Sequence, residues 1–312
     1  MTKVAPFAEV GGSTSHSPRK RIPLSVDDPV VITCSISGSL ANRDQCPAIP
    51  YTPQDYAAEA RRIVDEGGVM IHIHARRPDG TPSYEIEDFG AITQAIRDEV
   101  GDDVIINYST GAMGVPVEKR IAYLRELRPD VAALNMGSMN YAKYSARRKD
   151  FVFKAVFANP FDEIIALLEV MNEVGIKPEH ECFDVGHVGS LAPLVDMGLL
   201  HPPLHVSCVM GVLGGVPPTA RNLAMMADNV PAGSHWGVIG ISRAQWMLVA
   251  AALTLGGSIR VGLEDNFYLP NGEMARSNGD LIAKARQLVG DVGRRPATVA
   301  EAREQLGLAV RA

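Results

Sequence analysis

The sequence has few cysteines, no long apolar run and no surplus of positive charge. Its four cysteines lie far apart in 312 residues and form no Cys-x-x-Cys pair, which argues against a disulfide scaffold or a thiolate zinc finger and fits a reducing cytosol. Thirty basic residues against 36 acidic ones give a net charge of −6, whereas nucleic-acid-binding domains usually carry a basic surplus. No apolar stretch approaches the ~18 residues that indicate a membrane span. These absences predict a cytoplasmic globular protein that binds neither nucleic acid nor membrane.

Residues 1–28 differ in composition from the rest of the chain. They contain Gly11-Gly12-Ser13 and the basic cluster Arg19-Lys20-Arg21, but no apolar core of about 7–15 residues such as a secretory signal needs. We predict a surface or flexible N-terminal arm, with an arm that contacts another subunit as the alternative. No composition shift divides residues 29–312, so we expect them to form one catalytic domain.

From residue 29 onward, short apolar runs alternate with segments of helical periodicity. Strands are predicted at 30–36, 69–74, 104–108, 131–136, 179–183, 204–208, 236–240 and 259–263. Helices are predicted at 52–67, 84–100, 117–127, 161–174, 191–197, 219–229, 244–255 and 281–288, and a terminal helix at 298–306 begins with a capping box of Thr298 and Glu301. Eight strand–helix units predict an α/β fold of the (β/α)8, or TIM, barrel type. A doubly wound open sheet is the alternative, but no Gly-x-Gly-x-x-Gly follows the first strand.

Two histidines and one carboxylate form the strongest chemical signal. His72 and His74 alternate on the second predicted strand, so both imidazoles point to the same face, which is the interior in a barrel. An open catalytic zinc site needs a third protein ligand, and Glu264 at the end of the eighth strand is the best candidate. Since one layer of a barrel is built from alternate strands, the second and eighth strands can bring these three side chains together.

Several motifs resemble those of the β-keto acid cleavage enzymes, over about residues 29–306. They are residues 32–34 (ITC), 47–53 (PAIPYTP), 71–76 (IHIHAR), 108–111 (YSTG), 260–266 (RVGLEDN) and 275–281 (ARSNGDL). The resemblance implies a zinc-dependent barrel that forms a homo-oligomer, with a tetramer favoured. It also implies the reaction of a β-keto acid with acetyl-CoA, which gives acetoacetate and a new acyl-CoA.

The resemblance also implies roles for individual residues. It assigns one zinc ion per subunit to His72, His74 and Glu264, and it makes Asp265 the general base with Arg260 beside it. A bidentate pair with Arg260 would orient that carboxylate. It also assigns contacts with the substrate to Ser109, Thr110, Gly111, Ser138 and Asn140.

Some of these positions have a simpler interpretation. Ser109 and Thr110 could instead cap the next helix, and Asn140 could be a turn residue. Arg243, directly after the seventh predicted strand, is expected at the active-site face, where it could meet a CoA phosphate or a carboxylate. The glycine-rich loop 210–219 could approach a phosphate or thioester, or simply be a tight connection.

One position departs from the family pattern. A well-known member of the family acts on 3-keto-5-aminohexanoate and uses a carboxylate after the first strand to bind the substrate's amino group, whereas the matching residue here is Leu40. An ammonium buried beside leucine would lack a partner, so we expect an uncharged acyl tail. Asn42, Arg43 or Asp44 could take over this role, and Arg43 would permit a second carboxylate on the substrate.

Two other functions remain alternatives. A metal-dependent TIM-barrel hydrolase would also use a His-x-His strand and a carboxylate base, but it usually adds histidines on later strands, and here only His205 is suitably placed. A non-catalytic metal-binding barrel is the second alternative, although the retention of Arg260, Glu264 and Asp265 argues against it. His180 and His201 are expected on the surface.

Overall fold

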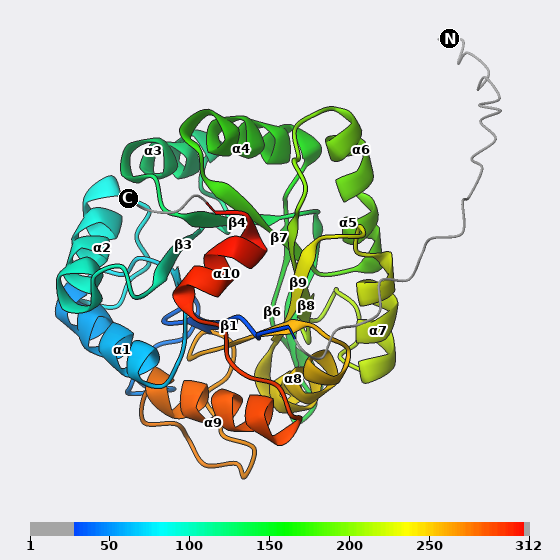
Figure 1. Cartoon of the computed structure of the whole chain (residues 1–312). Helices are drawn as coiled ribbons and strands as arrows, with labels where there is room; N and C mark the ends of the chain where they lie inside the picture. The colour runs from blue at the N-terminus through cyan, green and yellow to red at the C-terminus, as the bar shows by residue number, and fades with distance from the viewer. Residues whose placement is uncertain (1–27, 309–312) are drawn as a thin grey trace, which may run out of the picture.

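The computed structural model describes residues 28–308, which form a closed barrel of eight parallel strands surrounded by helices (Figure 1). In order around the barrel, the strands are β1 (Ile32–Ser35), β10 (Ser258–Val261), β9 (His235–Gly240), β8 (His205–Met210), β7 (Lys177–Cys182), β4 (Val131–Asn135), β3 (Ile105–Ser109) and β2 (Met70–Ile73). The predicted (β/α)8 barrel is confirmed, and the predicted arm lies outside the described residues except for Asp28.

The helices lie between consecutive strands on the outside of the barrel (Figure 1). They are α1 (Pro53–Asp65), α2 (Ile86–Val100), α3 (Val117–Leu127), α4 (Phe161–Val174), α5 (Val185–Gly189), α6 (Leu191–Asp196), α7 (Ala220–Asn229), α8 (Gln245–Thr254) and α9 (Asn278–Asp291). Thr52 caps α1, as the sequence predicts, and the terminal helix α10 (Val299–Leu306) begins with the predicted capping box of Thr298 and Glu301.

Side chains alternate along each barrel strand between an apolar outer layer and a largely polar interior. In β8, Val206, Cys208 and Met210 belong to the apolar core cluster, and their neighbours in sequence point the other way. The same alternation in β7 puts Glu179 and Glu181 inside the barrel, where Asn107 and Ser207 donate hydrogen bonds to Glu179. The middle of the barrel interior therefore holds charged and polar side chains.

Helix α10 closes the N-terminal end of the barrel (Figure 1). Its Ala302 and Leu306 form a second apolar cluster with residues at the starts of the strands, namely Val31, Val69, Met70, Ile105 and Val131. Because this end is plugged, small molecules enter from the opposite end, where parallel strands finish and where catalytic groups of such barrels lie.

The sequence-based prediction missed one supersecondary element. No helix or strand is predicted between residues 136 and 161, but this segment contains the antiparallel hairpin of β5 (Met139–Ser145) and β6 (Asp150–Phe157), inserted between β4 and α4. Its strands are mostly exposed on both sides, so they carry no hydrophobic alternation by which a half-buried strand is recognised.

The prediction that His180 lies on the surface is wrong. The alternation of β7 turns its side chain outward into the layer between sheet and helices, where it is only 1% exposed. Burial lowers its pKa to about 3. His201 is exposed, as predicted.

No helix within residues 28–308 has the length and apolarity to cross a bilayer.

Candidate active site

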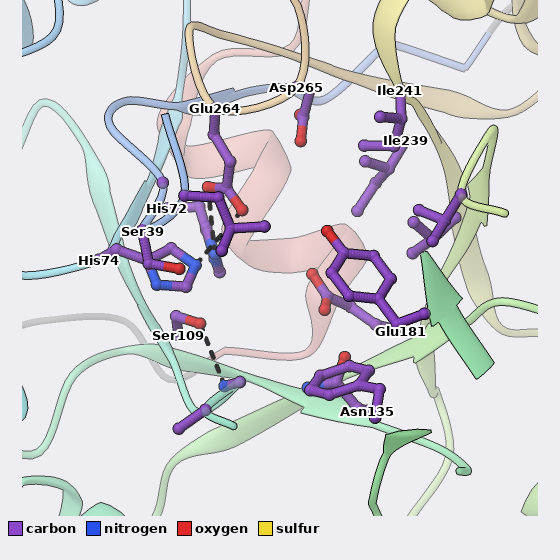
Figure 2. A pocket seen from close by; sticks show the side chains of 18 of the residues that line it. Ser39, His72, His74, Ser109, Asn135, Glu181, Ile239, Ile241, Glu264 and Asp265 are labelled. Atoms are coloured by element: carbon purple, nitrogen blue, oxygen red, sulfur yellow. Dashed lines mark hydrogen bonds and ion pairs between the residues drawn. The ribbon is translucent and has the colours of Figure 1, made fainter. Parts of the chain in front are cut away.

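A cavity of about 310 Å³ opens at the C-terminal ends of the barrel strands. Figure 2 shows that its labelled polar side chains point toward one another from different strands. The polar and ionisable lining residues are Ser37, Ser39, Tyr84, His72, His74, Ser109, Asn135, Tyr141, Glu181, Arg260, Glu264 and Asp265. Leu40, Ala41, Pro82, Ala112, Met113, Phe157, Phe183, Val209, Val212, Ile239 and Ile241 supply the apolar wall. The cavity therefore combines one charged region with a larger apolar surface.

The three predicted metal ligands converge in this cavity (Figure 2). His74 Nε2 lies 3.3 Å from Glu264 Oε1, and His72 Nε2 lies 3.7 Å from Glu264 Oε2. The arrangement arises because β1 pairs with both β2 and β10 and so holds the two ligand-bearing strands on either side of it.

Two glycines allow the ligand strands to approach. Gly38, directly beyond β1, has φ +60°, and a Cβ there would lie 2.7 Å from Glu264 Cγ. Gly262, just after β10, has φ +150°, and a Cβ there would lie 2.2 Å from the Ser35 carbonyl oxygen. Only glycine fits both requirements, so these residues set the position of the Glu264 side chain.

The geometry of the triad fits a cation. Glu264 Oε2 is buried, and no donor among the described residues hydrogen-bonds to it. Burial lowers the pKa of His72 to about 3, with Arg260 adding to the effect, so this imidazole is neutral and can act as a ligand. Burial acting alone would raise the pKa of Glu264, but Arg260 and the two histidines hold it below its usual range, so the carboxylate is ionised.

Arg260 is the centre of a buried cluster of charges. Its Nε and Nη2 donate to the two oxygens of Asp265, each at 2.9 Å, which is the bidentate contact expected from the sequence. Its Nη1 donates to Glu181 at 3.0 Å, and its Nη2 lies 3.1 Å from Glu264. Ser35 Oγ donates to Asp265 Oδ2 at 2.6 Å. Asp265 is thus held by three hydrogen bonds in one orientation.

This cluster has more negative than positive charge. One guanidinium faces the carboxylates of Glu181, Glu264 and Asp265, and all four side chains are largely buried. Burial raises the pKa of Glu181 and of Asp265, and Arg260 opposes this rise. A divalent cation at the histidines would offset the excess negative charge.

The structure brings some predicted substrate-binding residues to the cavity. Ser109 lies at the end of β3, where its hydroxyl accepts a hydrogen bond from the Gly111 backbone N–H at 3.2 Å, and both residues line the cavity. Leu40 also lines it and is 59% exposed. Arg43 instead contacts Asp55 at 2.7 Å and donates to the Ile49 carbonyl, and it is not among the residues that line the cavity.

Four other residues predicted as substrate contacts lie outside the lining of this cavity, and their contacts with substrate stay predictions. The Thr110 hydroxyl donates to the Ala133 carbonyl, and the Ser138 hydroxyl accepts from the Asn159 N–H. Asn140 is an exposed residue of β5, and Arg243 is exposed in the short 3-10 helix Ser242–Ala244. Their motif matches alone did not show which way the side chains point.

Other residues that line the cavity were not predicted from the sequence. Glu181 and Asn135 end barrel strands at inward-facing positions, and strand parity could have identified both. Tyr141 and Phe157 reach the cavity from the hairpin, and no signal identified them because the hairpin itself was not predicted. His205 faces inward next to Glu179, below the cavity, as a buried core histidine.

A model of the β-keto acid cleavage enzyme family matches residues 29–308. The chain belongs to this family. A 3-keto-5-aminohexanoate cleavage enzyme of Fusobacterium nucleatum is 34% identical over 279 residues, covering 89% of this chain and 98% of that protein. The family resemblance of the sequence motifs is thereby confirmed, and so is the conclusion that the protein is an enzyme that cleaves β-keto acids.

The names of two further relatives give other substrates. A 3,5-dioxohexanoate:acetyl-CoA acetone transferase of Paraburkholderia graminis is 35% identical over 302 residues, covering 89% of this chain and 96% of that protein. A 3-oxoadipate:acetyl-CoA acetyltransferase of Cupriavidus necator is 32% identical, covering 90% and 95%. Among solved structures, apo ObcA has the same fold, with a TM-score of 0.72 at 21% identity; the match covers 85% of this chain and 66% of that one.

Substitution of Arg260 by methionine tests the charge cluster. Removing one partner of a buried ion pair destabilises a protein by about 3–5 kcal/mol, so we expect Arg260→Met to lower the free energy of unfolding by that amount in chelator-treated protein. The loss should be larger at pH 8 than at pH 5. A carboxyl whose pKa is raised in the folded protein destabilises that protein only when the pH exceeds the pKa of the same carboxyl in the unfolded chain. Denaturant unfolding, with Arg260→Lys as the charge-retaining control, measures this. A loss under 1 kcal/mol for Arg260→Met would show that the cluster does not depend on the guanidinium.

Proposed function

We propose that this enzyme condenses a β-keto acid with acetyl-CoA and releases acetoacetate and a new acyl-CoA. The observation that carries the proposal is the meeting of His72, His74 and Glu264 with the Arg260-bound Asp265 in one cavity. Two relatives whose names include acetyl-CoA support the choice of co-substrate.

We infer that His72, His74 and Glu264 hold one divalent metal ion per subunit, and that it is zinc. Two imidazoles and one carboxylate would form a ligand set that catalytic zinc sites use. Bound there, the ion would act as a Lewis acid that polarises the β-keto oxygen of the substrate and stabilises negative charge on it.

Asp265 is proposed as the general base. Arg260 and Ser35 fix its carboxylate at the cavity wall, and it would take a proton from the carbon between the two carbonyl groups of the β-keto acid. That carbon then forms a bond to the acetyl carbon of acetyl-CoA, whose C–S bond breaks and releases the CoA thiolate. The thiolate adds to the original β-carbonyl carbon, the bond from that carbon to the deprotonated carbon breaks, and the acyl group stays on the CoA sulfur. The proton held by Asp265 returns to the carbon, which gives acetoacetate from the acetyl group and the carboxymethyl unit of the acid.

The apolar wall supports an uncharged acyl tail. Apart from the two histidines and the cluster around Arg260, no readily charged side chain lies among the described residues of the cavity lining. Leu40, Ala41, Pro82 and Met113 offer apolar contacts instead. We therefore propose linear uncharged β-keto acids, such as 3-oxopentanoate or 3-oxohexanoate, as the substrate class.

A metal-dependent hydrolase stays the alternative, and product analysis separates the two. Incubation of the purified protein with 3-oxohexanoate should produce acetoacetate and butyryl-CoA only when acetyl-CoA is present. If mass spectrometry detects free acids and no CoA esters, the result would favour hydrolysis.

The four buried free cysteines support a cytoplasmic location, and the family resemblance supports a homo-oligomer.

Substitution of both histidine ligands tests the metal site. We expect His72→Ala/His74→Ala to lose the bound metal and the activity, whereas His201→Ala, an exposed control, should keep both. Elemental analysis of purified protein gives the stoichiometry. Metal retained at one ion per subunit in the double variant would place the ion elsewhere.

Substitution of the proposed base separates metal binding from catalysis. Asp265→Asn is nearly isosteric and should keep the metal but reduce turnover by about 10²–10⁴-fold, the usual contribution of general-base catalysis. Asp228→Asn on the exposed face of α7 is the matched control. A rate for Asp265→Asn within a few-fold of wild type would show that another group takes the proton.

Substitution of Leu40 tests the tail specificity. The wild type should have a higher kcat/KM for 3-oxohexanoate than for 3-keto-5-aminohexanoate or 3-oxoadipate, because the apolar part of the lining offers no partner for a charge on the tail. Leu40→Glu should shift the preference toward the amino compound, and Leu40→Gln controls for polarity without charge. If the wild type prefers the amino compound, Leu40 does not contact the tail.

A further inference from the structure

The hairpin of β5 and β6 extends the cavity wall away from the barrel. At its root, Tyr141 and Phe157 line the cavity. The N–H of Ala142 in β5 donates to the Leu213 carbonyl at 3.3 Å, so the loop after β8 supports that edge. Strand β6 pairs only with β5 among the described residues, which leaves its outer edge with free backbone donors and acceptors.

Aromatic rings follow one another along this hairpin. The buried Phe183 contacts Phe157 with ring centroids 6.1 Å apart, Phe157 lies 5.9 Å from Tyr141, and Tyr141 lies 5.3 Å from Phe153. Beyond the register shift at Lys143/Tyr144, Tyr144 and Phe151 form the outermost pair at 5.7 Å. Both rings of this pair are at least 40% exposed. An apolar surface thus runs from the cavity to the tip of the hairpin.

The tip itself is strongly basic. Five cationic residues lie on the turn and the adjoining strand positions, namely Lys143, Arg147, Arg148, Lys149 and Lys154. Within residues 28–308 none of the five has a carboxylate partner within 4.0 Å, and Asp150, the one acid on the hairpin, accepts from the N–H of Phe151. The whole chain has a net charge of −6, so this positive charge is a local feature.

The cavity, the aromatic surface and the basic tip offer partners for the thioester, the adenine and the phosphates of coenzyme A. A thioester at the metal site would leave the pantetheine arm along the hairpin, where its amides can pair with the free edge of β6. The eight residues of β6 span roughly 26 Å at about 3.3 Å per residue, a distance that suits an extended pantetheine arm and diphosphate. The adenine and the phosphates would then reach the rings and cations of the tip.

We propose that the β5–β6 hairpin binds the nucleotide end of coenzyme A, with the phosphates on Arg147, Arg148 and Lys149 and the adenine on the Tyr144–Phe151 pair. This inference rests on the proposed function, which supplies the co-substrate. It also explains why a two-stranded hairpin, which is marginally stable alone, keeps exposed rings and cations that have no carboxylate partner. The glycine-rich loop 210–219 is not needed to bind the phosphates. A Cβ at Gly214 would lie 1.7 Å from the Asn140 carbonyl oxygen, and a Cβ at Gly215 would lie 2.6 Å from the Phe183 carbonyl oxygen. Close packing therefore accounts for both glycines.

Direct binding of coenzyme A tests the phosphate contacts. In calorimetric titration of the full-length protein, Arg147→Ala/Arg148→Ala/Lys149→Ala should raise the Kd for coenzyme A about tenfold or more, because each charge-assisted hydrogen bond contributes roughly tenfold to affinity. Arg125→Ala/Arg286→Ala/Arg295→Ala, which removes three exposed arginines far from the cavity, should leave the Kd unchanged. An unchanged Kd in the tip variant would overturn the proposal.

A shortened co-substrate tests the same site by kinetics. Acetyl-pantetheine lacks the nucleotide, so the tip variant should lower the ratio of kcat/KM for acetyl-CoA to that for acetyl-pantetheine about tenfold. Phe151→Ala should lower it about fivefold or more by loss of stacking, whereas Phe161→Ala, an exposed phenylalanine on α4, should not. If the tip variant lowers both values of kcat/KM equally and also changes the molar mass in light scattering, the hairpin is a subunit interface and the proposal is wrong. If the wild type binds coenzyme A at the tip but gives no acetoacetate, the proposed function fails and the binding site stands.

Discussion

The contacts of Arg260 with three carboxylates are the interaction on which the site depends. A guanidinium is the side chain best suited to this place, because its planar fork can bind two oxygens of one carboxylate and still reach others. Here it fixes the orientation of Asp265 and lies within contact distance of Glu181 and Glu264. The three acids repel one another, so removal of the cation would leave them unpaired in a buried setting. The remaining excess of negative charge supports the proposal that a divalent cation binds at the neighbouring histidines.

The barrel supports this cluster through the order of its strands. Since β1 lies between β2 and β10, the His-x-His strand and the Arg260 strand face the same part of the cavity. Gly38 and Gly262 permit the close approach, while α10 closes the opposite end. The inserted hairpin adds the wall that the barrel alone lacks, and its rings and cations extend that wall to a length that suits a coenzyme rather than a small acid.

Sequence reasoning recovered the fold and the convergence of His72, His74 and Glu264, because both follow from strand periodicity and strand order. Eight strand–helix alternations predict a barrel, and the parity of His72, His74 and Arg260 within their strands predicts the inward direction. It gave less where side-chain direction depends on tertiary contacts. Thr110 and Ser138 match family motifs, but the Thr110 hydroxyl donates to a backbone carbonyl, the Ser138 hydroxyl accepts from a backbone N–H, and neither residue lines the cavity. The hairpin has exposed apolar residues on both faces, so its strands carry no alternation, and the buried His180 could not be told from a surface histidine without the register of β7.

The fate of the acetyl group tests the central claim most directly. The purified enzyme would be incubated with 3-oxohexanoate and acetyl-CoA that carries carbon-13 in both acetyl carbons, and the products would be analysed by mass spectrometry. The account predicts acetoacetate that contains both labelled carbons and butyryl-CoA that contains none, because the acetyl group is joined to the carbon deprotonated by Asp265 while the original acyl group moves to the CoA sulfur. Unlabelled acetoacetate, or labelled acetate with free butyrate, would contradict it.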